Sequence, residues 1–277
     1  MYADCHMHMI LDGVDWKAAI RRHQQGPDRP WIRSILQTYQ QLGVTYLRDG
    51  GDRWGAGAAA RQLAPEYGIT YRTPLAPLCM EGHYGAFIGL TYRDLKEYAA
   101  LVRRQKQQGA DFIKIMISGL MDFHQFGVLT EPGLPPEIIR ELIHIAHEEG
   151  MAVMAHANGA DTVLAAAAAG VDSVEHGAYQ NTESLAAMAQ MGTVWVPTLS
   201  TVGNLLGKGR FPDGQVAAIL ESSLQSLVDY SGMVAPGTDA GAWAVPHGSR
   251  TEEALLAQAG ITRDRLLAGA CEIMRKF

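Results

Sequence analysis

Cysteine is scarce in this sequence, and long apolar runs are missing from it. Three cysteines occur in 277 residues, and Cys5, Cys79 and Cys271 are far apart as well as odd in number. Such usage is typical of reduced thiols in the cytoplasm and argues against a disulfide framework. No stretch approaches the roughly 20 apolar residues that cross a membrane, and the N-terminus lacks the basic-then-apolar pattern of a signal peptide. We therefore expect a cytoplasmic protein without a membrane span.

Clusters of positive charge are also absent. The net charge is −6, and the 23 lysine and arginine residues are scattered along the chain, which argues against a nucleic-acid-binding surface. Hydrophobic residues make up 47% of the sequence and charged residues 19%, which is ordinary for a globular protein with a large core. The expected partner is a small molecule, not a nucleic acid or a membrane.

A helix-like segment, a glycine and a short apolar strand recur along the sequence. Gly43 precedes the apolar residues 44–47, and Gly109 comes shortly before 112–115. Such a glycine can adopt the left-handed conformation that ends a helix, so each one marks a helix feeding a strand. Helices that alternate with short, nearly all-apolar strands indicate parallel strands covered by helices.

The pattern predicts eight strands. They are expected near residues 3–8, 44–48, 69–75, 111–117, 151–156, 171–175, 193–197 and 233–238. Amphipathic helices are expected at 91–108, 135–149, 159–169, 182–191, 213–230 and 262–275. Eight such units predict a single-domain (β/α)8 TIM barrel over residues 1–277, without a flanking β-sandwich domain. A doubly wound open sheet is the rival fold, disfavoured because no glycine-rich phosphate loop follows the first strand.

Lys114 is the least expected residue of the predicted strands. It lies in the apolar run 111–117, where a buried ammonium group is costly unless something neutralises or uses it. One interpretation is an ion pair with Asp122 or a similar acid at the mouth of the barrel. The other is a lysine modified by carbon dioxide to a carbamate, whose two oxygens could bridge two metal ions. An unmodified ammonium has no lone pair to donate to a metal.

Five potential metal ligands stand at the ends of other predicted strands. His6 and His8 are two residues apart, so they face the same side of the first strand. His156, His176 and Asp239 each end a later strand, and barrel enzymes keep their active sites at this end of the strands. The five side chains could thus converge on zinc or a related divalent ion. The alternative is that they are separate polar residues, each satisfied locally.

Taken together, these motifs resemble the metal-dependent amidohydrolase superfamily, in particular its two-metal branch with a carboxylated lysine on the fourth strand. The segments that carry the resemblance are 4–8, 112–115, 154–157, 174–177 and 237–240. A narrower likeness to imidazolonepropionase-like and prolidase-like enzymes rests on 44–49, Gly82-His83 and Glu175-His176-Gly177. The resemblance covers nearly the whole chain and is much more specific for the superfamily than for a substrate.

The resemblance implies a complete catalytic centre. Its ligand sets would be His6, His8 and Asp239 for one metal, His156 and His176 for the other, and carboxylated Lys114 as the bridge. The ions would be zinc, with manganese, iron and cobalt as alternatives, and a hydroxide shared between them would attack the carbonyl. Asp239 would carry the proton to the leaving amine. The implied reaction is hydrolysis of a C–N amide bond in a small dipeptide or N-acyl amino acid, and similar enzymes favour a homo-oligomer.

Loops after the strands are expected to select the substrate. His83, Tyr84, Tyr179 and His247 could each donate a hydrogen bond to a developing oxyanion. Among them, His83 and Tyr179 are favoured as catalytic residues, because similar positions act in this way in the prolidase-like group. Each of these side chains could instead only pack within its loop.

Other polar residues are less specific. Arg210 and its neighbour Lys208 could bind a substrate carboxylate, although solvated loop charges are the simpler interpretation. Arg48 and Asp49 are expected to form an ion pair at the barrel mouth. Asn158 departs from the family pattern, in which histidine is common at this position, and could alter support of the site.

Three other functions compete with amide hydrolysis. A lactonase or phosphoester hydrolase could use the same two-metal centre, because only the leaving group differs. A mononuclear deaminase of a purine-like or pyrimidine-like ring would work without Lys114, so that residue counts against it. A barrel that keeps its metal only as a structural or binding element is the non-enzymatic alternative.

Overall fold

A computed structural model of the protein describes residues 2–277, and nine short strands occur within this range. The strands are β1 (Tyr2–Met7), β2 (Val44–Asp49), β3 (Thr70–Arg72), β4 (Leu78–Met80), β5 (Leu90–Tyr92), β6 (Ile113–Met116), β7 (Val153–Ala157), β8 (Ser173–His176) and β9 (Val194–Val196). They form two sheets, in the orders β1-β2-β3 and β5-β4-β6-β7-β8-β9. Every pairing between these strands is parallel, as the sequence predicts.

Helices alternate with these strands. They are α1 (Trp16–His23), α2 (Arg29–Gln41), α3 (Ala56–Leu63), α4 (Leu95–Gln107), α5 (Pro136–Glu148), α6 (Ala160–Ala168), α7 (Thr182–Met191), α8 (Ser200–Gly203), α9 (Asp213–Asp229), α10 (Thr251–Gln258) and α11 (Arg263–Lys276), with a 3-10 turn η1 (Ala64–Tyr67). The predicted helices at 135–149, 159–169, 182–191, 213–230 and 262–275 are confirmed within two residues. No helix within residues 2–277 has both the length and the apolar character that crossing a membrane requires.

The segment 233–240 joins the two sheets, although it is not the regular strand that the sequence predicts at 233–238. Ala235 N–H donates to the carbonyl of Trp195 in β9, and Trp195 N–H donates to the carbonyl of Met233. On the other side Asp239 N–H donates to the carbonyl of His6 at 2.7 Å. Pro236 has no N–H to donate, which interrupts the ladder. The segment nevertheless lies between β9 and β1, which is the place expected for the predicted eighth strand.

The predicted third strand, 69–75, is divided in the structure. It ends early because Pro74 lacks an N–H and Leu75 adopts a left-handed backbone with φ of 68°. The chain then resumes as β4, which pairs with β6 and with the unpredicted strand β5. Because residues 90–92 belong to β5, the helix predicted at 91–108 begins only at Leu95, after its N-cap Asp94.

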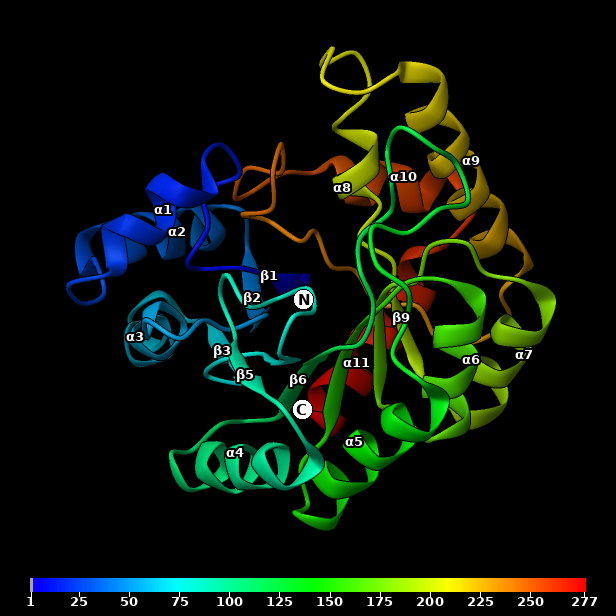
Figure 1. The fold of residues 1–277 in the computed structure, drawn as a ribbon. Coiled ribbons are helices and arrows are strands. Elements are labelled where there is room, and N and C mark those ends of the chain that lie inside the picture. Colours follow the sequence, from blue (N-terminus) through cyan, green and yellow to red (C-terminus); the bar gives the residue numbers. More distant parts are fainter. Residues whose placement is uncertain (1) are drawn as a thin grey trace.

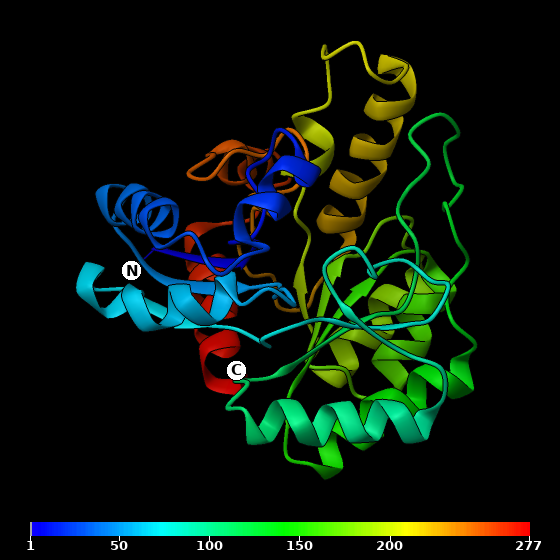
Figure 2. The same ribbon diagram turned by 60° about the vertical axis from the view of Figure 1, so that its left-hand side comes forward.

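The helices lie outside the strands. Helices α4 to α7 follow the outside of the six-stranded sheet, and α1 to α3 flank the three-stranded sheet (Figure 1). Helix α11 runs beside the strands (Figure 2) and carries Phe277, whose ring packs against Phe112 with centroids 5.2 Å apart. The guanidinium of Arg48 lies 4.4 Å from the centre of the Phe277 ring. This apolar packing leaves the carboxyl ends of the strands as the open face of the molecule.

Candidate metal centre

Because the strands are parallel, their carboxyl ends meet at the same end of the sheet and bring the predicted ligands together there. Register pairs His156 with Glu175 and Ala157 with His176 across β7 and β8, while Lys114 pairs with Met154 across β6 and β7. Two of the ligands have left-handed backbones, with φ of 67° at His176 and 55° at Asp239. Such conformations are costly for residues with a Cβ and cluster at functional sites.

The ligand atoms of His6, His8 and Asp239 lie in the geometry that a metal ion requires. The two Nε2 atoms are 3.3 Å apart, and Asp239 Oδ1 lies 3.5 Å from that of His6 and 3.1 Å from that of His8. A tetrahedral zinc ion with bonds of about 2.05 Å separates its ligand atoms by about 3.3 Å. All three side chains are buried. The three residues therefore fit a divalent metal ion.

His156 and His176 form a second pair of nitrogen ligands next to this triad, with ring centroids 4.5 Å apart. His156 Nε2 donates to the carbonyl of Gly119 at 3.2 Å, which leaves Nδ1 with its lone pair. His176 Nδ1 lies 2.7 Å from the hydroxyl of Thr198, which leaves Nε2 free. Partners of this kind fix the ring orientation of metal-binding histidines.

Lys114 lies close enough to His6, His156 and His176 to lower the pKa of each imidazole. Its Nζ is buried and has no hydrogen-bond partner among residues 2–277. Burial lowers the pKa of Lys114 to about 8, against the opposing effect of the Glu175 carboxylate. The alternative interpretation, an ion pair between Lys114 and Asp122, is not found among the described residues, and the Asp122 carboxylate accepts the backbone N–H of His124 at 2.8 Å. A buried amine without a partner is consistent with a group that is completed by modification.

Glu175 is the functional residue that the sequence analysis missed. Its Oε1 lies 2.8 Å from Arg48 Nη2, and its Oε2 lies 2.8 Å from His6 Nδ1. Burial alone would raise the pKa of Glu175, but Arg48 and His6 hold it at about 2. The carboxylate thus orients His6 so that Nε2 faces the metal site.

The sequence did contain a signal for this pair. Arg48 and Glu175 are opposite charges, each within a predicted buried strand, and such charges are paired in proteins. The expected Arg48–Asp49 pair is wrong, because successive residues of a strand point to opposite sides. Asp49 instead accepts hydrogen bonds from the hydroxyl of Thr73 at 2.9 Å and the backbone N–H of Met9 at 3.2 Å.

Burial also shifts the pKa values of the predicted metal ligands. It lowers the pKa of His6 to about 4 and that of His156 to about 3, and the Lys114 charge adds to both effects. Burial would raise the pKa of Asp239, but His6 and His8 lower it overall. At neutral pH the two imidazoles are therefore neutral and the carboxylate is charged, which are the forms that bind metals.

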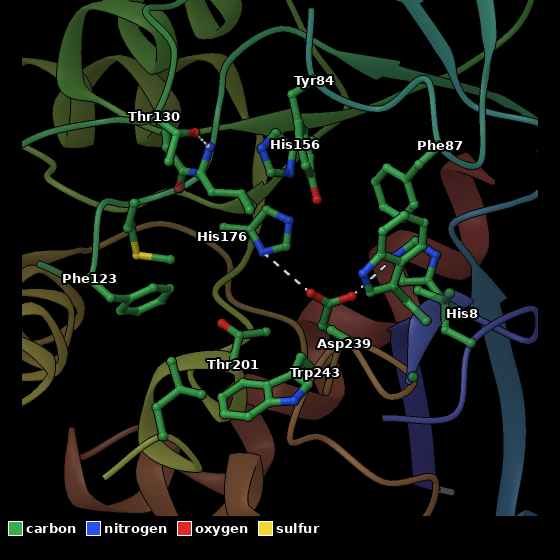
Figure 3. Close-up of a pocket in the computed structure, with 18 of the residues that line it drawn as sticks. His8, Tyr84, Phe87, Phe123, Thr130, His156, His176, Thr201, Asp239 and Trp243 are labelled. Atoms are coloured by element: carbon green, nitrogen blue, oxygen red, sulfur yellow. Dashed lines mark hydrogen bonds and ion pairs between the residues drawn. The ribbon is translucent and has the colours of Figure 1, made fainter. Parts of the chain in front are cut away.

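A cavity of about 570 Å³ opens above these ligands. Two of the predicted substrate-binding residues, Tyr84 and Arg210, line it. The Tyr84 ring lies 4.9 Å from that of His156, and its side chain extends into the cavity (Figure 3). The other three predicted residues, His83, Tyr179 and His247, are not part of the lining.

Local contacts explain the positions of these three residues. His83 Nδ1 lies 3.7 Å from Glu131 at the half-exposed rim, and Tyr179 packs against the ring of Phe126 at 5.4 Å. His247 Nε2 donates to the carbonyl of Leu11 at 2.9 Å, on the outer side of the β1 loop.

Asn158 supports the site from behind. Its Nδ2 donates to the carbonyl of Gly119 at 3.1 Å, and its Oδ1 accepts the backbone N–H of Ala178 at 3.0 Å. The side chain therefore ties the loop after β6 to the loop after β8. Both loops carry partners or neighbours of the histidine ligands.

A ring of parallel strands covered by helices, with a buried His-His-Asp triad at its carboxyl face, defines a class of metal-dependent barrel enzymes. The family model described as "Amidohydrolase family" matches residues 43–242, which is more than half of the chain. The protein belongs to this amidohydrolase family.

Two curated relatives show how far the sequence similarity extends. An uncharacterized protein of Mycobacterium tuberculosis (strain ATCC 25618 / H37Rv) is 29% identical over 212 residues, which cover 70% of this chain and 54% of the relative. Ochratoxinase of Aspergillus niger is 25% identical over 279 residues, which cover 85% of this chain and 56% of that protein. The chain spans about half the length of these relatives.

Solved structures support the fold. A Xaa-Pro dipeptidase with bound methionine superposes with a TM-score of 0.79 at 20% identity, covering 99% of this chain and 75% of that chain. A prolidase complexed with N-methylphosphonate-L-proline gives a TM-score of 0.77 at 22% identity, covering 99% and 74%. At these identities the likeness concerns the fold, and it agrees with the predicted barrel.

Proposed function

We propose that the protein is a metal-dependent hydrolase that cleaves the C–N amide bond of a small N-acyl amino acid or dipeptide. The observation that carries the proposal is the triad of His6, His8 and Asp239, whose ligand atoms have metal-binding separations at the floor of a cavity. Membership of the amidohydrolase family and the fold of the dipeptidase and prolidase relatives support the choice of an amide.

We further propose that two ions are held, zinc in the first instance, with manganese, iron or cobalt able to replace it. His156 and His176 would hold the second ion, and Lys114, as a carbamate, would bridge the two. When bound, divalent ions supply Lewis acidity that lowers the pKa of water and polarises a carbonyl. The support for the bridge is the buried Lys114 Nζ, which has no hydrogen-bond partner among the described residues.

The protein's own side chains would then move protons and position the substrate. Asp239 is charged at neutral pH and lies at the centre of the cluster, so it would accept a proton from the attacking water and give it to the leaving amine. The hydroxyl of Tyr84 would donate to the substrate carbonyl oxygen as charge develops there. His83 and Tyr179 stay predicted donors that would have to turn toward the cavity.

A substrate panel and a lysine variant test this proposal. Purified protein supplied with zinc or manganese should bind two metal ions per chain and hydrolyse members of a panel of dipeptides and N-acyl amino acids. Lys114→Ala should abolish the second metal and most activity, whereas Lys96→Ala, at an exposed position of α4, should change neither. Fewer than two metals together with no amide hydrolysis would contradict the proposal, and turnover of lactones or phosphotriesters alone would favour the alternative hydrolases.

Cellular location and assembly belong to the same proposal. We propose a cytoplasmic enzyme that acts as a single barrel domain and forms a homo-oligomer. Size-exclusion chromatography with light scattering checks the assembly.

A further inference from the structure

The cavity above the metal ligands has two aromatic walls. The first wall consists of Trp16, Tyr84 and Phe87, and the second of Phe123, Phe211 and Trp243. Figure 3 shows Phe87 and Phe123 on opposite sides of Asp239, with His176 and Asp239 between them. Small N-acyl amino acids do not need so much apolar surface around a scissile bond.

The first wall is built by the first residue of α1 and by the loop after β4. The Trp16 ring meets the edge of Phe87 at a centroid distance of 5.5 Å, and Tyr84 lies 5.8 Å from Phe87. Trp16 is 45% exposed although it is a large aromatic residue. An exposed aromatic surface that faces a cavity is an available contact for an apolar ligand.

The second wall comes from loops after β6 and β9 and from the segment after Asp239. Phe123 and Phe211 lie 5.0 Å apart, and Phe211 meets Trp243 at 6.3 Å with rings almost perpendicular. These three rings come from three separate loops and together line one side of the cavity.

Arg210 places a positive charge on the second wall. Among the described residues that line the cavity, Lys114 and Arg210 are the only lysine and arginine, and Lys114 is assigned to the metal centre. The Arg210 guanidinium stacks 4.2 Å above the centre of the Trp243 ring, so its N–H edges stay available to a carboxylate. The nearby Asp122 carboxylate already accepts the N–H of His124.

We propose that the substrate is an N-aroyl or similarly bulky N-acyl derivative of an aromatic amino acid. The acyl ring would lie on the first wall, the amino-acid ring on the second wall, and the carboxylate on Arg210. The assignment rests on the proposed amide hydrolysis, because it places the scissile bond beside Asp239. Each ring adds apolar area that the cavity removes from water, which strengthens binding.

Four ligands test the two walls separately: N-benzoyl-L-phenylalanine, N-acetyl-L-phenylalanine, N-benzoylglycine and N-acetylglycine. Titration calorimetry with the metal-free full chain measures their binding without turnover. We expect each ring to lower the Kd about 10-fold or more, and the effects of the two rings to be nearly independent. Ratios within twofold of one would overturn the proposal.

Variants assign each ring to its wall. Phe211→Ala should abolish the preference for phenylalanine over glycine and keep that for benzoyl over acetyl, and Phe87→Ala should do the reverse. Phe211→Leu should retain part of the phenylalanine preference, which separates lost contact from misfolding. Arg210→Leu should raise the Kd of all four ligands about 10-fold. Arg93→Leu should not change the Kd values, because Arg93 is exposed and is not part of the cavity lining. Loss of both preferences in either aromatic variant would contradict the two-wall assignment.

Turnover separates this inference from the proposed function. If the metal-loaded enzyme hydrolyses N-acetylglycine as well as N-benzoyl-L-phenylalanine, amide hydrolysis stands and the aromatic specificity is wrong. If it hydrolyses no amide, the proposed function fails, and the binding ratios of the metal-free chain still decide whether the walls accept two rings.

Discussion

At the scale of single residues, the site is organised by charges that are buried together. Glu175 lies between the Arg48 guanidinium and the His6 imidazole, with contacts of 2.8 Å on both sides. All three side chains are at most 1% exposed. A buried charge is tolerated when its partner is present, and it becomes costly when that partner is removed. Glu175 therefore links the stability of the barrel to the orientation of a metal ligand.

The variant Glu175→Gln should lower both stability and metal affinity. Loss of the carboxylate leaves the Arg48 charge unpaired, so the free energy of unfolding should fall by about 3–5 kcal/mol. The affinity for zinc should fall about 10- to 100-fold, because His6 loses the partner that orients it. Urea unfolding of the metal-free protein and zinc titration measure the two effects.

Glu66→Gln serves as the control for this variant. Glu66 pairs with Arg33 on the exposed surface, so its removal should leave the unfolding free energy nearly unchanged. Equal losses in the two variants would show that burial of the Glu175 pair has no special effect.

Glu252 should make stability depend on pH. The carboxyl group accepts the backbone N–H and the hydroxyl of Ser200, each at 2.7 Å, and burial raises its pKa from 4.5 to about 7. Because the folded state binds this proton more tightly than the unfolded state, the contribution is full below pH 4.5. This contribution to stability declines as the pH rises and is lost above pH 7. The shift of the pKa from 4.5 to about 7 corresponds to a loss of about 3 kcal/mol in the free energy of unfolding.

Urea unfolding of wild type and Glu252→Gln across pH 4 to 8 checks this effect. The stability of the wild type relative to the variant should fall as the pH rises from 4.5 to 7. A constant difference over that range would show that Glu252 has an ordinary pKa in the folded protein.

At the scale of elements, the segment 233–240 is the critical piece, because it closes the ring and carries Asp239. Backbone hydrogen bonds tie it to β9 on one side and to β1 on the other. Gly237 lies at the narrowest point, where an added Cβ would meet Val196 Cγ1 at 2.3 Å and His6 Cβ at 2.9 Å. The close approach of this segment to β1 is what brings Asp239 to the two histidines.

Gly237→Ala should therefore push the segment away from β1. We expect a loss of about 1–3 kcal/mol in unfolding free energy from overpacking, together with weaker zinc binding. Gly214→Ala is the matched control, because nothing lies within 4 Å of a Cβ at that position in α9, and alanine favours helix. Thermal unfolding and zinc titration of the two variants check the comparison, and unchanged zinc affinity in Gly237→Ala would contradict the positioning role of this segment.

At the scale of the whole molecule, the metal triad joins the first strand to the segment that closes the ring. His6 lies in β1 and His8 directly follows it, and Asp239 comes from the segment 233–240. A metal that binds only the folded chain stabilises it by mass action, by about 2.7 kcal/mol at a free concentration 100 times the Kd. The ion would thus stabilise the closed barrel, because it binds residues from the first strand and from the segment that closes the ring.

Removal of metal should accordingly lower the Tm of the whole protein. Chelator treatment of the wild type should lower the Tm, and added zinc should restore it in a concentration-dependent way. Asp239→Asn, which weakens one ligand of the triad, should show a much smaller response. Equal Tm values with and without metal would indicate that no ion binds the folded chain.

The sequence predicted the order of strands and helices because each depends on local signals. Apolar runs, helix-ending glycines and the polar residues at the strand ends placed Lys114 and the five ligands on one face. For contacts made across the fold, local patterns did not say which residues would meet. The pairing of Arg48 with Glu175 and the rotation of Tyr179 onto Phe126 both depend on tertiary packing. The break at Pro74 was visible as a proline, but the return of the chain as β4 depends on the register with β6.

The central claim is that Lys114 is a modified bridge between two metal ions. A crystal structure of the metal-loaded protein, with anomalous scattering data at the zinc edge, tests it most directly. We predict density for a carbamate on Lys114 Nζ and two anomalous peaks, one beside His6, His8 and Asp239 and one beside His156 and His176. An unmodified lysine with a single peak at the triad would contradict the account.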